Sequence, residues 1–473
     1  MTRPPCTTRL VDVPSDETII PIHALRPESW DGLKVALSPA QSTFAEANGF
    51  VGGAGQIVML PSEDGHLAAI LLGCGEVSTD FDKEMRLGQL AARQSGGYYK
   101  LAQTPNDWSE RLAAISWGMG SYRFTRYLKD TPDVPQLVLD DALDASAIAA
   151  AIDATALGRD LINIPAGDMG PEALHQAAQD LADAHGATLT SVVGEELLAE
   201  NYPMIHAVGR AAHQAPRLVE FEWGDPSHPR LAVIGKGITF DTGGVNMKGA
   251  SGARLMKKDM GGAAHALALS SMIMAARLPI RLHCLLAIAE NAVSANAYRP
   301  GDILSSRAGL TVEIDNTDAE GRLVLGDALA KATEFDPVLM IDFATLTGAA
   351  RVALGPQLPP FFTNRPHLHD LVAQHGTSEL DPVWPMPLWQ PYHALLRSPI
   401  ADMKNAGGSF AGAVTAALFL ERFVDGRPWM HFDVYGWNPT SRAGHPKGAD
   451  VYAVRGLFSW LASGGLNTPM DGA

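Results

Sequence analysis

The chain has 473 residues, of which 46% are hydrophobic and 19% are charged. This length exceeds that of one ordinary domain, and the composition is typical of a folded globular protein rather than a disordered one. The 52 acidic residues outnumber the 36 basic residues and give a net charge of −16. That charge argues against nucleic acid as a partner, because the phosphate backbone is also negative.

The cysteines and the N-terminal residues indicate the cellular compartment of the protein. The three cysteines, Cys6, Cys74 and Cys284, are an odd number without paired spacing, as expected in a reducing compartment. The first 16 residues contain no continuous apolar core of the kind found in secretory signals. No run of about 18 apolar residues occurs either. We therefore expect a cytoplasmic protein that does not cross a membrane.

Residues 1–140 are predicted to form a small α/β domain. Two apolar, strand-like segments flank a turn at residues 62–65, which predicts a hairpin. An alanine-rich stretch then predicts a connecting helix, and we assign residues 141–165 to the connection and 166–473 to a second domain. The strands of the hairpin are expected at 56–61 and 66–73, and helices at 82–93, 108–118 and 141–163.

In the second domain, strand-like and helix-like segments alternate. This alternation predicts a mostly parallel central sheet flanked by helices on both faces, so the fold class is α/β. In such sheets the chemistry gathers at the carboxyl ends of the strands. Strands are expected at 230–240, 280–289, 338–343 and 430–434, and helices at 260–278 and 325–335.

Charged residues occur where these apolar segments end. Lys236 lies within the strand predicted at 230–240 and Asp241 directly follows it, while Asp259 directly precedes a helix that is apolar on all sides. Burying an isolated charge costs several kcal/mol, so buried charges are normally paired or bound to a metal ion.

A second charged segment spans residues 316–323 and contains Asp318, Glu320 and Arg322. The two carboxylates are two residues apart and can point to one side of an extended segment. Together with Asp241 and Asp259 they would bring four carboxylates into one place. Two divalent cations would neutralise that charge.

Each of these residues also has an ordinary explanation. Asp318 or Glu320 could cap the following helix, and Lys257 and Lys258 could form an exposed pair. Histidines within apolar segments are usually satisfied core groups, and we assign no role to His265, His283 and His431. The whole set of charges favours a metal site, because lysines and carboxylates interrupt glycine-rich strand ends at several places.

These segments resemble the leucyl aminopeptidase (cytosolic aminopeptidase) family of two-metal peptidases. Residues 316–323, Asn-Thr-Asp-Ala-Glu-Gly-Arg-Leu, match the family signature at every position. The intervals that separate Lys236, Asp241, Lys248, Asp259 and Asp318 also match. The similarity includes residues 160–165, 296–302 and 342–348, whereas the first half resembles the family only loosely, as at 120–124.

The resemblance implies a site with two metal ions. One ion would be bound by Lys236, Asp241, Asp259 and Glu320, and the other by Asp241, Asp318 and Glu320. A lysine ligates only as the neutral amine, so the ions must lower the pKa of Lys236 strongly. Zinc and manganese are the expected ions, and they would activate a bridging water.

The resemblance also implies roles beyond metal binding. Lys248 would stay protonated and polarise the scissile carbonyl, and Arg322 would hold a bicarbonate ion as general base. A salt bridge to a neighbouring carboxylate is the ordinary alternative for Arg322. Met256 and Thr345 match positions that line the side-chain pocket, although Met256 could equally fill a gap in the core. Tyr435 stands where alanine often occurs, which predicts a narrower or more polar pocket.

The sequence thus predicts an aminopeptidase that removes N-terminal residues, with Leu or Met preferred, from peptides. The resemblance further implies a homohexamer. Two alternatives stay open at this point. A two-metal phosphoesterase uses similar carboxylates, although the phosphate-cradling G-x-x-x-x-G-K-[ST] loop is missing. An additional architectural DNA-binding role is known in the family, and the negative charge argues against it here.

Overall fold

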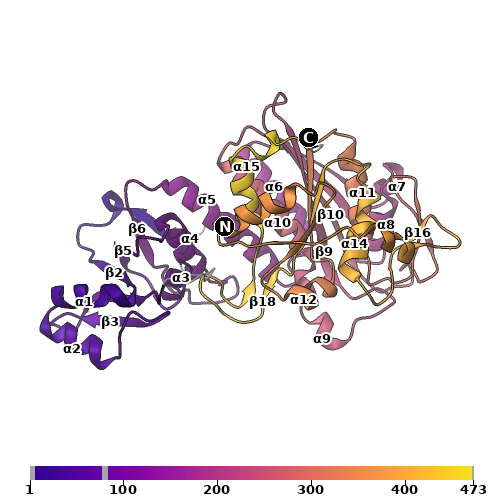
Figure 1. Cartoon of the computed structure of the whole chain (residues 1–473). Coiled ribbons are helices and arrows are strands. Elements are labelled where there is room, and N and C mark those ends of the chain that lie inside the picture. The colour runs from indigo at the N-terminus through magenta and orange to yellow at the C-terminus, as the bar shows by residue number, and fades with distance from the viewer. Residues whose placement is uncertain (1–5, 77–83, 471–473) are drawn as a thin grey trace. The chain divides into compact units, whose positions relative to one another are not determined.

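The computed structural model describes residues 6–76 and 84–470. The chain divides into two compact units (Figure 1), one of residues 1–156 with 440–447 and one of residues 157–439 with 448–473. The helix predicted at 141–163 is α5 (Ala145–Asn163), which runs across this division. Within the residues described, no helix is both long enough and apolar enough to span a membrane.

The first unit contains a six-stranded sheet in the order β1-β6-β5-β2-β4-β3. Its strand pairs are parallel except β3 with β4, which form the predicted hairpin. The helix predicted at 82–93 is shorter, and residues 82–83 lie outside the described part. The elements are β1 (Thr7–Arg9), β2 (Ile19–Leu25), α1 (Pro27–Ala36), α2 (Pro39–Ala47), β3 (Ile57–Pro61), β4 (Leu67–Gly73), α3 (Arg86–Ala91), β5 (Tyr98–Gln103), α4 (Glu110–Ser121) and β6 (Gln136–Leu139).

The second unit is built on an eight-stranded sheet in the order β15-β14-β17-β13-β9-β10-β8-β7. Its four central strands are mutually parallel, which confirms the predicted α/β class. The antiparallel pairs lie towards the edges. The strands are β7 (Thr188–Val193), β8 (Arg217–Trp223), β9 (Arg230–Asp241), β10 (Arg281–Asn291), β13 (Leu339–Ala344), β14 (Pro360–Thr363), β15 (Trp384–Pro385) and β17 (Trp429–Asp433).

Helices cover both faces of this sheet (Figure 1). One face packs against α6 (Pro171–His185) and α10 (Gly261–Ala275), and α15 (Val454–Ala462) packs against α10. The other packs against α8 (Pro203–Gly209) and α11 (Gly321–Thr333), and α14 (Gly412–Glu421) packs against α11. Because both faces are covered, β9 is buried along almost its whole length, as its continuous apolar sequence predicts.

Close packing brings the start of α10 against the middle of the sheet. A β-carbon at Gly262 would lie 2.2 Å from the carbonyl oxygen of Phe343 and 2.9 Å from the backbone nitrogen of Lys236. Only glycine fits there. The helix therefore begins directly beside two central strands, and the residues just before it are held at the carboxyl ends of those strands.

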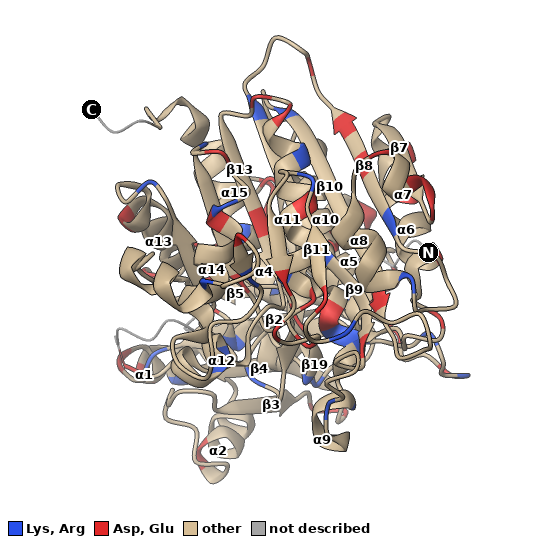
Figure 2. Ribbon diagram, turned by 90° about the vertical axis from the view of Figure 1, so that its right-hand side faces the viewer, with Lys and Arg blue, Asp and Glu red and all other residues tan. Residues whose placement is uncertain are grey.

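The remaining elements connect these layers or lie at their edges. Acidic and basic residues are interspersed along the ribbon in Figure 2. The other elements are η1 (Leu10–Asp12), α7 (Glu196–Ala199), α9 (Ala250–Ala253), η2 (Met256–Met260), β11 (Ile303–Ser305), β12 (Thr311–Glu313), α12 (Gly348–Leu354), α13 (Leu368–Ser378), η3 (Gln390–Leu396), β16 (Met403–Lys404), β18 (Trp437–Asn438), β19 (Gly448–Ala449) and η4 (Gly465–Asn467).

Candidate metal centre

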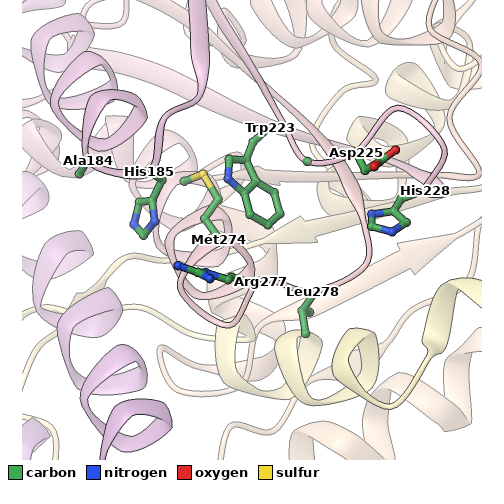
Figure 3. A pocket seen from close by; sticks show the side chains of 9 residues that line it. Ala184, His185, Trp223, Asp225, His228, Met274, Arg277 and Leu278 are labelled. Carbon is green, nitrogen blue, oxygen red and sulfur yellow. The ribbon is translucent and has the colours of Figure 1, made fainter.

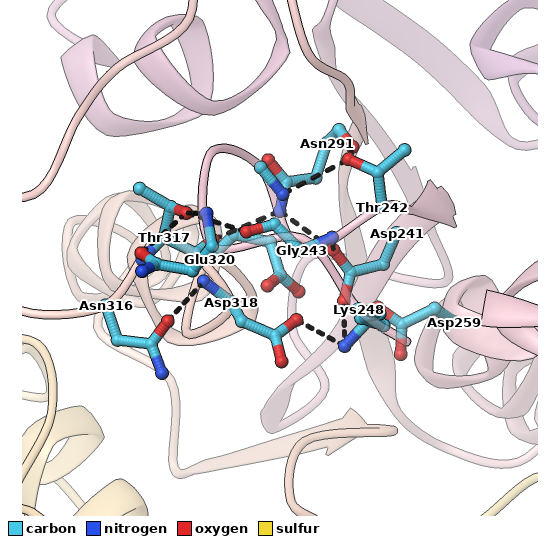
Figure 4. Close-up of polar contacts among 12 residues, drawn as sticks. Asp241, Thr242, Gly243, Lys248, Asp259, Asn291, Asn316, Thr317, Asp318 and Glu320 are labelled. Carbon is cyan, nitrogen blue, oxygen red and sulfur yellow. Dashed lines mark hydrogen bonds and ion pairs between the residues drawn. The ribbon is translucent and has the colours of Figure 1, made fainter. Parts of the chain in front are cut away.

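Asp241 is the last residue of β9 and is buried. Its Oδ1 accepts hydrogen bonds from the backbone nitrogen of Gly243 and from Asn291 Nδ2, both at 2.8 Å (Figure 4). Asn291 ends the neighbouring strand β10 and lies in register with Asp241. The second oxygen, Oδ2, lies 2.7 Å from Lys248 Nζ. The carboxylate is thus held from two sides, as a preorganised ligand would be.

Lys236, also on β9, connects two further carboxylates. Its Nζ lies 2.7 Å from Asp259 Oδ2 and 3.0 Å from Glu320 Oε1, and it donates a hydrogen bond to the carbonyl oxygen of Thr345 at 3.1 Å. A β-carbon at Gly321 would lie within 2.7 Å of the end of the Lys236 side chain. Glycine at position 321 therefore lets the amine reach Glu320.

The carboxylates come from three separate segments. Asp259 lies in η2, directly before α10, and Glu320 is the N-cap residue of α11. The Glu320 side chain makes no capping hydrogen bond, so helix capping does not explain this residue. Asp318 and Glu320 do not form an extended segment as predicted, because they lie in the turn that leads into α11.

Three of these carboxylates form a compact, buried group. One oxygen atom each from Asp241, Asp259 and Glu320 lies within 4.8 Å of the others. Glu320 Oε2 is buried and has no hydrogen-bond partner among the residues described. An unsatisfied buried carboxylate oxygen is costly. A divalent cation between these oxygens would satisfy it and offset the negative charge.

The pKa values reflect this crowding. Burial, with Asp241 nearby, raises the pKa of Glu320 to about 7, and burial together with Asp259 raises the pKa of Asp241 to about 6. Burial would lower the pKa of Lys236, but the carboxylates of Asp259, Glu320 and Asp241 outweigh it and raise the pKa. To act as a ligand, Lys236 must lose its proton, so bound cations would have to reverse this effect.

Lys248 lies between Asp241 and Asp318 on the loop after β9. Its Nζ contacts Asp241 Oδ2 and Asp318 Oδ1. Burial would lower the pKa of Lys248, but Asp241 and then Asp318 raise it above its usual value. The side chain therefore stays protonated at neutral pH. Asp318 is the most exposed of the predicted ligands, with 31% of its side chain accessible.

Arg322 is buried in the first turn of α11. Its Nη1 donates to the carbonyl oxygen of Asn405 at 2.8 Å, while its Nε has no hydrogen-bond partner within the described residues. Burial lowers the pKa of Arg322 to about 10, so the guanidinium keeps its charge at neutral pH. Arg322 thus donates to a carbonyl group rather than to a carboxylate, and its Nε–H remains available to an anion.

Comparison with known proteins identifies the family of the chain. The family model for the catalytic domain of the cytosol aminopeptidase family matches residues 156–458, and the model for the M17 aminopeptidase N-terminal domain matches residues 20–140. The chain belongs to the cytosol aminopeptidase (M17) family. It is a metal-dependent aminopeptidase, as the resemblance predicts.

Individual relatives agree with this assignment. The probable cytosol aminopeptidase of Syntrophotalea carbinolica is 36% identical over 91% of this chain and 93% of its own length. The crystal structure of the Coxiella burnetii cytosol aminopeptidase has a TM-score of 0.89 at 41% identity, covering 95% of this chain and 98% of that one. The bottromycin maturation enzyme BotP, solved in complex with Mn, has a TM-score of 0.86 at 30% identity, covering 94% and 99%.

Of the predicted pocket residues, Thr345 contacts one of these carboxylates. Thr345 is buried, and its Oγ1 donates to Asp259 Oδ1 at 2.8 Å, so it also positions a predicted ligand. Met256 begins η2 and is only half-buried. The ring of Tyr435 is half-buried and contacts Lys258 Nζ, 5.1 Å from the ring centre, and the Arg351 guanidinium, 4.8 Å away.

Of the explanations that did not involve a metal ion, the exposed lysine pair is wrong and the core histidines are confirmed. The exposed lysine pair is wrong for Lys258, which is 5% exposed, because the short η2 turn faces the sheet rather than solvent. The histidines are partnered core groups as predicted. His265 bonds to Gly261 and Tyr452, His283 to Glu220, and His431 to Asp342.

Sequence reasoning missed the residues that hold the ligands. Asn291 Nδ2 bridges Asp241 and the carbonyl oxygen of Thr317, which also accepts from the Tyr298 hydroxyl at 2.7 Å. The available signal was Asn291 itself, a polar residue two positions beyond the predicted end of the strand next to β9. Its partners could not be read from the sequence, because Thr317 and Tyr298 lie on separate loops.

A separate pocket of about 380 Å³ lies at the other end of the strands (Figure 3). Most of its lining comes from segments that precede β9 and β10, where those strands begin, and the rest comes from the end of α6. It contains none of the predicted site residues, so it belongs to a different region from the metal centre. It is lined by Ala184, His185, Trp223, Gly224, Asp225, His228, Met274, Arg277 and Leu278.

Proposed function

We propose that this aminopeptidase releases one N-terminal residue at a time from peptides, using two divalent cations bound by five residues. The observation that carries the proposal is the buried group of oxygens from Asp241, Asp259 and Glu320 within 4.8 Å of one another. Lys236 and Asp318 contact this group directly or through Lys248. When bound, the cations would supply an activated water and a docking point for the free α-amino group.

Lys248 is the proposed electrophilic group. Its raised pKa keeps it cationic, and its position on the loop beside Asp241 and Asp318 lets it donate a hydrogen bond to the scissile carbonyl oxygen. A preorganised donor aimed at a developing oxyanion is worth about 10²–10³-fold in kcat. Arg322, with its free Nε, is the proposed site for a bicarbonate ion that would receive the proton of the attacking water.

The identity of the ions follows from the donors. Carboxylate oxygens suit manganese and magnesium, and zinc also accepts them and binds more tightly. The structure of BotP contains Mn, which supports manganese as one of the ions here. We propose that zinc and manganese exchange, at least at the weaker site. A Leu-like or Met-like first residue is the proposed preference.

The decisive experiment compares two substrates and two variants. After removal of metal with a chelator and addition of Mn²⁺, the enzyme should hydrolyse leucyl-p-nitroanilide and not p-nitrophenyl phosphate. Asp259→Asn should lose at least about 100-fold in kcat/KM and bind less Mn²⁺. Asp225→Asn, at an exposed turn remote from the centre, is the matched control and should keep wild-type activity.

Lys248→Met separates catalysis from metal binding. We expect kcat to fall about 10²–10³-fold while calorimetry still shows two Mn²⁺ ions bound per chain. Full activity of Asp259→Asn, or one bound ion in the wild type, would contradict the proposal.

The assembly and location remain proposals from the family resemblance. We propose a cytoplasmic homohexamer that does not bind nucleic acid. Light scattering should give about six times the 50.3 kDa mass of one chain, and a monomer would refute the assembly. Filter binding at low salt should detect no retention of duplex DNA.

A further inference from the structure

Lys258 is a buried cation without an anionic partner of its own. It lies in η2 next to Asp259 and is 5% exposed. Its Nζ makes no hydrogen bond or ion pair with any residue that the structure describes, and its aromatic contact is with the ring of Tyr435, at 5.1 Å. A buried ammonium normally has a carboxylate beside it, because the loss of hydration costs several kcal/mol.

A second cation contacts the same aromatic ring. Arg351, on α12, places its guanidinium carbon 4.8 Å from the centre of the Tyr435 ring. Arg351 is exposed and, within residues 6–76 and 84–470, forms no ion pair. The charges of Lys258 and Arg351 lie close enough to repel each other. Tyr435 is therefore flanked by two like charges, and the arrangement opens to solvent on the side of Arg351.

The surroundings compensate these charges only in part, because Asp259 attracts the Lys258 ammonium without forming an ion pair with it. A cation–π contact contributes about 0.5–2 kcal/mol, which is less than the cost of burying an ammonium group. The carboxylate nearest in sequence, Asp259, is already engaged, since its oxygens contact Lys236 Nζ at 2.7 Å and Thr345 Oγ1 at 2.8 Å. An additional anion that reached both Lys258 and Arg351 would satisfy both cations.

The location indicates where that anion comes from. Lys258 directly precedes Asp259 in η2, and its charge interacts with those of Asp259, Lys236 and Lys248, so Lys258 lies near the proposed metal centre. A carboxylate on a bound peptide would be close to the scissile bond in two cases. It is either the side chain of an acidic first residue or the C-terminal carboxylate of a dipeptide.

We propose that Lys258 and Arg351 bind a carboxylate of the peptide substrate and so extend the substrates of this enzyme to acidic peptides. This inference rests on the proposed peptidase function. A substrate with a carboxylate should therefore be favoured over the same substrate with an amide, and the preference should depend on Lys258.

The first measurement compares kcat/KM for glutamyl-p-nitroanilide with that for glutaminyl-p-nitroanilide, which has the same shape without the charge. Lys258→Met should lower this ratio about 10-fold, and Arg351→Met should lower it less because that side chain is exposed. Lys258→Arg keeps the positive charge and should retain most of the wild-type ratio. Lys257→Met is the matched control, since Lys257 donates to the carbonyl oxygen of Asn163 and contacts Trp437 instead.

The second measurement repeats the comparison with leucylglycine and leucylglycine amide, in which the C-terminal carboxylate alone differs. A Lys258-dependent change in the anilide ratio assigns the carboxylate to the first residue, and a change in the dipeptide ratio assigns it to the C-terminus. Two ratios that Lys258→Met leaves unchanged would overturn the inference.

A binding measurement keeps this test independent of catalysis. Calorimetry with the Mn²⁺-loaded enzyme should show that L-glutamate binds more tightly than L-glutamine in the wild type and not in Lys258→Met. If leucyl-p-nitroanilide is not hydrolysed by the wild type, the proposed function fails, whereas equal affinities for the two amino acids overturn the carboxylate site alone.

Discussion

Asn291 and Asp241 occupy matching positions at the ends of the adjacent parallel strands β10 and β9, and Asn291 Nδ2 donates to Asp241 Oδ1 at 2.8 Å. The same amide group also donates to the carbonyl oxygen of Thr317 at 3.1 Å. One side chain therefore joins a predicted ligand on β9 to the turn that carries Asp318 and Glu320.

Asn291→Ala should weaken metal binding without removing a ligand. The loss of a group that orients a ligand typically costs about 10–100-fold in metal affinity, and we expect the Kd for Mn²⁺ to rise by that factor in calorimetry. Asn296→Ala is the control, because Asn296 lies on the exposed loop after β10. Equal affinities for the two variants would show that Asn291 does not position Asp241.

Thr345 should matter through its hydroxyl group. Its Oγ1 donates to Asp259 Oδ1 at 2.8 Å, so Thr345→Val, which keeps the shape and removes the donor, should raise the Kd for Mn²⁺ about 10-fold. Thr345→Ser keeps the donor and should bind Mn²⁺ like the wild type. If Val and Ser bind Mn²⁺ equally well, the hydroxyl group does not hold Asp259 for the metal.

Metal affinity should depend on pH in a defined direction. The raised pKa values of Glu320, about 7, and Asp241, about 6, mean that these carboxyls hold protons at pH 5.5. A cation must displace those protons, so its affinity rises with pH. We expect the Kd for Mn²⁺ to be about 10–100-fold higher at pH 5.5 than at pH 7.5. A Kd that is constant over this range, with no proton release in buffers of different ionisation enthalpy, would contradict the prediction.

His265 should make the free energy of unfolding fall in mild acid. Burial lowers its pKa from 6.5 to about 4, so between these values the unfolded chain binds a proton that the folded chain does not. The free energy of unfolding therefore decreases as pH falls from 6.5 to 4, by up to ~3 kcal/mol.

Urea unfolding at pH 7 and pH 5 tests this effect. From pH 7 to pH 5 the wild type should lose ~2 kcal/mol more than His265→Asn, whose side chain does not titrate. The other titrating groups are the same in both proteins, so their contributions to the change in the free energy of unfolding cancel in this comparison. Equal losses would show that His265 is protonated as easily in the folded as in the unfolded state.

The sequence predicted the fold because its hydrophobic pattern is strong. The apolar run that forms β9 and the apolar helix α10 are visible without any tertiary information, since both are buried on all sides. The predicted helix at 260–278 ends early, at Ala275, because Arg277 adopts a φ of 50° that a helix does not allow. Such a local backbone change has no clear signal in the hydrophobic pattern.

The candidate site was predictable only as far as its charged residues. Lys236 and Asp241 interrupt an apolar strand and therefore call for an explanation. Asn291 gives a weaker signal, because Asn is common at strand ends, and Thr345 is predicted only as a pocket residue, from the family resemblance. The environment of Lys258 depends on a ring from Tyr435 and a guanidinium from Arg351, which meet it only in the folded chain.

Lys236 and Lys248 reach the metal centre from different kinds of structural element. Lys236 extends from a buried central strand, whereas Lys248 extends from a loop whose neighbouring residues Val245 and Met247 are exposed. The loop that carries Lys248 is thus partly open to solvent, whereas Lys236 is enclosed between the sheet and the helices that cover it. Ions that enter beside Lys248 and Asp318 would accordingly come and go quickly, and ions beside Lys236 would stay for much longer.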